Sequence, residues 1–104
     1  MAHNYGREKF YLATLCLATG EGSIHARLES AAVALSVIEP TEDLPVTEIA
    51  NFEQMWRELT AREAESDFEG KIGSTVRQLD PNDAASLAER IFDMYFRVLG
   101  VHPL

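Results

Sequence analysis

The sequence predicts an all-α fold, a compact bundle of four to five short helices. Apolar residues recur three and four positions apart along most of the chain, which is the spacing of one helix face. Prolines and glycines separate these stretches, and no strand-like alternation or internal repeat competes with them. We expect one domain over residues 1–104, with mobile tails at 1–5 and 101–104. The expected helices span about 6–19, 23–38, 46–62, 71–79 and 81–99.

The first expected helix lacks a side that favours water. Between Phe10 and Ala18 every residue except Thr14 is apolar, aromatic or small, so we expect this helix to lie at the centre of the bundle. Gly20 follows it and suits the left-handed backbone position after a helix end. The only cysteine, Cys16, lies among leucines, which predicts a buried thiol and leaves no disulfide to form.

The second expected helix begins at Ser23, whose hydroxyl suits the N-cap position, and ends before Pro40. One of its faces carries larger apolar residues, and the opposite face carries small ones. Two apolar faces predict a helix that packs between neighbours on both sides. The first face comprises Ile24, Leu28, Ala31, Leu35 and Ile38, and the second comprises Ala26, Ser30, Val33 and Val37.

The third expected helix has one apolar face and is expected to lie at the surface. Two pairs of opposite charge stand four residues apart on it, Glu53 with Arg57 and Glu58 with Arg62, a spacing that stabilises a helix. Its apolar face comprises Ile49, Phe52, Met55, Trp56 and Leu59.

The last two expected helices differ in how clearly the sequence marks them. The fourth is short and is weakened by Gly73. The fifth begins with Asp80 as N-cap, followed by a proline at its first position, and it ends at Gly100. Phe92 and Phe96 widen its apolar arc beyond what one neighbouring layer covers.

An excess of apolar surface on three helices predicts a homodimer. Most helices of a five-helix domain face water on one side, yet the first, second and fifth carry wider apolar arcs than a monomer covers. A two-fold dimer uses one self-complementary patch twice. In the alternative interpretation, these side chains complete the core of a monomer. The candidate interface residues are Ala26, Val33, Val37, Phe92 and Phe96.

The net charge of −8 comes from one third of the chain. Residues 39–69 hold ten acidic residues and two arginines, whereas the segments on either side each sum to zero. This acidic stretch predicts a surface for a basic protein partner, and the alternative is a solvated outer helix. An acidic chain argues against nucleic-acid binding through a basic surface and against attraction to anionic lipid. The candidate binding residues are Glu58, Glu63, Glu65, Asp67 and Glu69.

The sequence also favours a cytoplasmic protein that does not enter a membrane. The charged and polar run at the N-terminus lacks the apolar stretch of a signal peptide. The longest apolar runs are about eight residues, short of the roughly 18 that a membrane helix needs. A single cysteine fits a reducing compartment.

Two groups of side chains are candidates for ligand binding. His25 and Glu29 stand four residues apart on one helix, which suits two metal ligands, yet no third ligand accompanies them. We therefore expect no metal and no cofactor, with His25 a partly exposed polar residue. Phe52, Met55 and Trp56 suit a small-ligand pocket between helices, and the same spacing equally fits a core stripe.

Arg97 and His102 are a candidate pair for RNA cleavage. They are separated by four residues, and a cation beside an imidazole can stabilise a phosphorane while the imidazole moves protons. This spacing is similar to the loose Arg-x(4 to 6)-His motif of the helical HEPN ribonucleases. Two residue types at loose spacing match often by chance, and Gly100 and Pro103 interrupt the helix that would present both groups.

Together these features favour a non-catalytic protein that acts by binding another macromolecule, as an adaptor, an inhibitor, or an antitoxin-like or immunity-like partner. We expect no enzyme, since neither a Gly-x-Ser-x-Gly nor a Ser-x-x-Lys nucleophile motif is present. Two alternatives stay open. One is a helical bundle that binds a small ligand near Trp56, and the other is a ribonuclease that uses Arg97 and His102.

Overall fold

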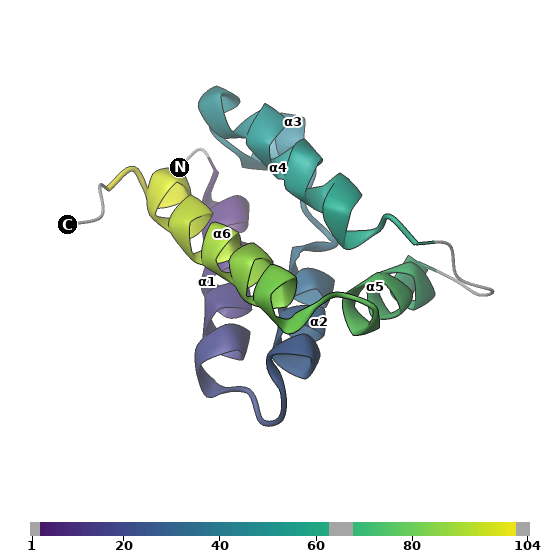
Figure 1. Ribbon diagram of the computed structural model, residues 1–104. Coiled ribbons are helices and arrows are strands. Elements are labelled where there is room, and N and C mark those ends of the chain that lie inside the picture. The colour runs from purple at the N-terminus through teal and green to yellow at the C-terminus, as the bar shows by residue number, and fades with distance from the viewer. Residues whose placement is uncertain (1–2, 63–67, 102–104) are drawn as a thin grey trace.

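The buried apolar side chains of the helices form one core. The computed structural model describes residues 3–62 and 68–101 (Figure 1). The described residues form helices and connecting turns without a strand, so the predicted all-α fold is confirmed. None of the described helices is both long and apolar enough to cross a membrane. The helices are α1 (Asn4–Thr19), α2 (Ile24–Leu35), α3 (Pro40–Asp43), α4 (Val46–Leu59), α5 (Phe68–Arg77) and α6 (Pro81–Leu99).

The α1–α2 hairpin is the part of the fold on which α5 and α6 pack (Figure 1). α1 and α2 pack along each other, α6 lies across both, and α5 packs on α2. α4 packs against α3, α5 and α6 but barely approaches α2. The radius of gyration is 13.0 Å, the value expected of a compact chain of about this length.

Large apolar side chains from four of the helices fill the core. Phe10 of α1, Leu28 and Leu35 of α2, Met55 of α4 and Ile91 of α6 have no exposed surface. Full burial of such a side chain stabilises the fold by about 1.5–3 kcal/mol relative to its exposure. All five lie at positions that the sequence places on apolar helix faces.

Capping signals predict three helix ends correctly. The Ser23 Oγ accepts a hydrogen bond from the Ala26 N–H at 3.1 Å, and an Asp80 carboxylate oxygen accepts one from the Asn82 N–H at 2.7 Å. Gly100 has a φ of 84°, so it holds the left-handed position that ends α6. A cap satisfies backbone groups that a helix end leaves unpaired, so its position depends on residues close together in the sequence.

The segment after α2 differs from the prediction. α2 ends at Leu35 and not at residue 38, and Pro40 begins α3 besides following α2. Proline suits the first helical position because its missing N–H needs no partner there. An Asp43 carboxylate oxygen also accepts the Glu39 N–H at 2.8 Å, which closes this short helix on itself. The described residues therefore form six helices, and α3 is the one that the sequence did not reveal.

α1 ends at Thr19 as predicted, but its start and the conformation of Gly20 differ from the prediction. The helix begins at Asn4, so the last two residues of the expected tail belong to it, and the His3 carbonyl accepts the Arg7 N–H at 3.0 Å. Gly20 is extended, with a φ of −67°, and does not take the left-handed conformation. Gly22 takes that conformation instead, with a φ of 94°, because the turn into α2 and not the end of α1 requires it.

The ends of α4 and α5 are also shifted. α4 ends at Leu59, three residues before the predicted end, where the Thr60 hydroxyl donates to the Trp56 carbonyl at 2.8 Å. A threonine that bonds back to the preceding turn competes with helix continuation. α5 spans Phe68–Arg77, so it begins three residues before the predicted start and ends two before the predicted end.

Gly6 allows α3 to reach α1. It is buried, and a Cβ atom at this position would overlap the backbone carbonyl of Asp43, the last residue of α3. Gly73 in α5 is buried as well, but a Cβ atom there would meet only the ends of the Arg77 and Glu29 side chains, at 2.9 and 3.2 Å. A side-chain end can rotate away, whereas a backbone carbonyl cannot without moving its helix.

Gly6→Ala is expected to lower the free energy of unfolding by about 1–3 kcal/mol, because the added methyl group overpacks the contact with α3. Gly73→Ala is the matched control, since both glycines are buried within helices. We expect it to be neutral or stabilising, by up to about 1 kcal/mol, because alanine favours a helix. Urea denaturation of both variants measures the difference, and equal losses would contradict the close approach at Gly6.

Candidate functional site

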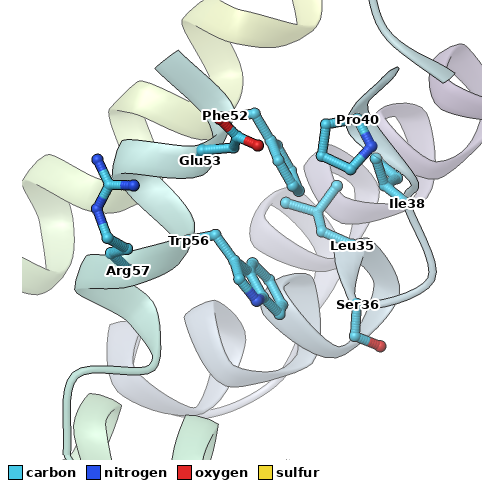
Figure 2. Close-up of a pocket in the computed structure, with 8 residues that line it drawn as sticks. All are labelled: Leu35, Ser36, Ile38, Pro40, Phe52, Glu53, Trp56 and Arg57. Atoms are coloured by element: carbon cyan, nitrogen blue, oxygen red, sulfur yellow. The ribbon is translucent and has the colours of Figure 1, made fainter. Parts of the chain in front are cut away.

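A pocket of about 400 Å³ lies between the C-terminal end of α2 and the middle of α4 (Figure 2). It exists because α4 packs against α6 and barely approaches α2. Figure 2 shows Phe52 and Trp56 projecting from α4 toward Leu35 of α2. We call it the α2–α4 pocket, and its lining residues are Leu35, Ser36, Ile38, Pro40, Phe52, Glu53, Trp56 and Arg57.

Two of the three predicted pocket residues line the α2–α4 pocket. The Phe52 and Trp56 rings are stacked, with centroids 5.8 Å apart and planes 10° from parallel. Phe52 is only 3% exposed, and Phe10 of α1 packs edge-on against it with centroids 6.0 Å apart. The third predicted residue, Met55, is fully buried in the core and does not line the pocket.

The polar groups at the mouth of the pocket differ in whether they already have hydrogen-bond partners. Arg57 donates to the Gln54 side-chain oxygen at 2.8 Å, and Figure 2 shows its guanidinium pointing away from Trp56. The Ser36 hydroxyl donates to a carbonyl of its own helix. Glu53 is exposed and has no hydrogen bond or ion pair to any other described residue, so its predicted pair with Arg57 is not formed. The mouth thus carries two charges without an ion pair among the described residues, the Glu53 carboxylate and the Arg57 guanidinium, and only the guanidinium has a hydrogen bond to one of them.

Glu58, a predicted member of the acidic surface, is already paired. Its carboxylate accepts hydrogen bonds from Arg90 of α6 at 2.8 Å and from Gln54 at 3.2 Å. The hydrogen bond from Arg90 lowers the pKa of Glu58, against a smaller opposing effect of burial. The expected partner on its own helix, Arg62, is not the one it uses.

The rest of the predicted acidic surface is outside the described part of the chain. Glu63, Glu65 and Asp67 fall between the two described ranges, and the side chain of Glu69 is not described either. Binding of a basic partner by this stretch therefore stays a prediction.

Arg97, the predicted catalytic cation, forms an ion pair with Glu48. Its Nε donates to a Glu48 carboxylate oxygen at 2.9 Å, and the Asn51 amide donates to the same oxygen at 3.3 Å. Glu48 is only 5% exposed, so this is a buried carboxylate that depends on its donors. His102 lies outside the described residues, so the predicted pair of Arg97 and His102 is not tested.

His25, one of the two metal candidates, contacts the backbone that leads from α5 to α6. Its Nε2 lies 2.9 Å from the Leu79 carbonyl oxygen, and because that oxygen only accepts, Nε2 donates. Glu29 lies on the same helix and approaches Gly73 of α5. The described residues contain no group of three side chains that would hold a metal ion.

Four aromatic rings form a continuous row across α1 and α6. Their centroids are 6.5 Å apart from Tyr11 to Tyr95, 6.1 Å from Tyr95 to Phe96 and 4.9 Å from Phe96 to Phe92. The two ends are the most exposed, at 52% for Tyr11 and 45% for Phe92. We call this set the aromatic row. α1 is thus not enclosed on every side as predicted, because its outer face meets no other described helix.

An apolar groove continues from the aromatic row along the crossing of α1 and α6. Phe92 belongs to both, and Glu89 is the only charged residue that lines the groove. Two candidate dimer residues, Phe92 and Phe96, therefore lie on one continuous apolar surface. The lining residues are Thr14, Leu17, Ala18, Ile24, Ala88, Glu89 and Phe92.

The small-residue face of α2 carries the other dimer candidates. Ala26, Val33 and Val37 are all exposed, with Ser30 between them. The prediction that α2 packs between neighbours on both sides is wrong for the described residues, because no helix among them covers this face. None of the four lines the groove at Phe92, so the candidate residues do not form one patch around it.

The sequence did not reveal the residues that face these features. Leu35, Ile38 and Pro40 complete the α2–α4 pocket, and Tyr11 and Tyr95 extend the aromatic row. An apolar residue looks the same in a sequence whether it faces a core or a pocket. The one available signal was the uncharged run of α1, which is longer than a single buried face needs.

The chain has no significant match among protein-family models, curated proteins or solved structures. No known family therefore lends a residue role to it. The similarity to the HEPN ribonucleases rests on the spacing of Arg97 and His102 alone.

Arg97→Ala is expected to lower the free energy of unfolding by about 2–3 kcal/mol, because the buried Glu48 carboxylate loses its charged donor. Arg90→Ala is the matched control on the same helix. Its pair with Glu58 is exposed and is expected to contribute less than about 1 kcal/mol. Denaturant titrations measure the free energy of unfolding of both variants, provided that both unfold with the same dependence on denaturant concentration. Equal losses of this free energy would show that the burial of Glu48 does not increase the effect of the substitution.

Glu58 is expected to titrate below its ordinary pKa of 4.5 in the folded chain, and Arg90→Gln is expected to move its pKa back toward that value. Because the pKa is lower in the folded than in the unfolded chain, the pair stabilises the fold above the unfolded pKa. That contribution is lost as the pH falls through the folded pKa. An NMR titration of the Glu58 carboxyl carbon checks both, and an unchanged pKa in the variant would contradict the assignment.

Proposed function

We propose that this chain is a non-catalytic protein-binding domain that associates with a second copy of itself through the aromatic row. One observation carries the proposal: Tyr11 and Phe92 remain about half exposed although their rings belong to a contiguous set of four. Exposed aromatic clusters of this kind are typical of the centre of a protein interface.

The charge around the aromatic row favours a second copy over a basic partner. The part of α1 from Phe10 to Ala18 has no charged residue, and the adjoining groove is lined by one, Glu89. A basic protein would find little to pair with there. Two copies that meet at the aromatic row itself bring no charged member of that set into contact, and a two-fold axis uses the same patch twice.

A role as an adaptor, an inhibitor, or an antitoxin-like or immunity-like partner is consistent with this proposal, because each acts by covering the surface of another protein. The acidic stretch 39–69 would then be a second surface, directed at a basic partner. The two surfaces respond to salt in opposite ways. Screening strengthens the association of two acidic copies and weakens the binding of a basic partner.

We expect the chain to form dimers of twice 11.6 kDa, detected by sedimentation equilibrium, and to dimerise more tightly at higher salt. Phe92→Ser is expected to weaken dimerisation by at least about tenfold, because it removes an aromatic anchor. Val46→Ser is the matched control, since Val46 is 82% exposed at the start of α4, away from the aromatic row.

A wild-type chain that stays monomeric at several hundred micromolar would overturn the proposal, as would equal effects of the two substitutions. Circular dichroism spectra of the variants establish that each one is folded.

A further inference from the structure

We propose that the α2–α4 pocket binds a small organic cation that has an apolar ring, with the ring against Trp56 and the positive charge beside Glu53. This inference does not depend on self-association, because the pocket and the aromatic row have no residue in common.

The walls of the pocket favour an apolar ring. Leu35, Ile38 and Phe52 are buried side chains that still line it, so they form an apolar floor. Trp56 forms an aromatic wall that is stacked on Phe52. The volume of about 400 Å³ falls within the range of ligand pockets.

The pocket is fixed open by the packing of α4 on its opposite side. Glu48 and Glu58, ten residues apart on α4, are paired with Arg97 and Arg90 of α6. Movement of α4 toward α2 would strain both pairs and would uncover the buried Glu48 carboxylate. The pocket therefore does not close without a cost, and a ligand finds it already formed.

The charge at the mouth selects a cation. The Glu53 carboxylate has no partner among the described residues. The Arg57 guanidinium keeps its positive charge but is bonded to Gln54 and points away from Trp56 (Figure 2). Exposed Glu39 and Glu42 beside Pro40 add negative potential on the α3 side. The face of the Trp56 indole also attracts a positive charge. An anion would meet the same carboxylates.

The test uses three probes that share a phenyl ring on a chain of four carbons and differ in the end group that sets their charge: 4-phenylbutylamine, 4-phenylbutanol and 4-phenylbutyrate. Binding is followed in two-dimensional NMR spectra of the chain through the Trp56 indole N–H and the Leu35 and Ile38 methyl signals. We expect the amine to bind about tenfold more tightly than the alcohol, and the butyrate to bind most weakly.

Glu53→Gln is expected to reduce the preference for the amine by at least about threefold and to leave binding of the alcohol unchanged. Glu42→Gln is the matched control and is expected to keep most of the preference. Both positions are exposed, so neither substitution threatens the fold.

Three results would overturn the proposal. One is the absence of binding by the amine at millimolar concentration. Another is equal affinity for the amine and the butyrate. The third is a set of shifted signals confined to the aromatic row, which would place the ligand on the other surface.

Discussion

The ion pair between Glu48 and Arg97 joins α4 to α6, and the α2–α4 pocket lies where α4 leaves space beside α2. The pair is buried at its acidic end, so separation of α4 from α6 would leave a carboxylate without its donor. With α4 held on its α6 side, space remains on its α2 side, and Phe52 and Trp56 line that space. Because α6 uses its arginines on α4, its opposite side is left with the aromatic residues that meet α1.

Local signals predicted the helices, and tertiary contacts decided where several of them end. Asp80 and Gly100 bound α6 as expected because each cap acts within one turn of chain. Pro40 was ambiguous, since a proline both follows a helix and opens one, and α3 is stabilised by Asp43 and by a close approach to Gly6 that no local pattern reveals. A glycine within a helix ordinarily weakens it. Gly6 is required here because α3 packs closely against α1 at this position.

The sequence showed how charge is distributed along the chain, but it did not show which charged residues pair with each other. The two arginines of α6 appear in the sequence to balance the acidic residues of their own segment, but both pair with carboxylates of α4. Spacing along one helix predicted the pairs Glu53 with Arg57 and Glu58 with Arg62. Glu58 instead pairs with Arg90 of α6, and Arg57 bonds to Gln54 of its own helix. For the pocket, spacing along the helix correctly predicted Phe52 and Trp56, but it wrongly added Met55, which is buried in the core. It did not predict Leu35, because residues on different helices have no fixed spacing in the sequence.

Trp56 is the only tryptophan of the chain, and it stands at the gap between α2 and α4. Its ring stacks on Phe52, which packs against Phe10 in the core and also lines the pocket. With excitation selective for tryptophan, the emission of the protein therefore originates from the gap between α2 and α4 alone. An unfolding curve followed by that emission would report the separation of these two helices, and it would coincide with a curve from backbone signals only if the chain unfolds as a single cooperative unit.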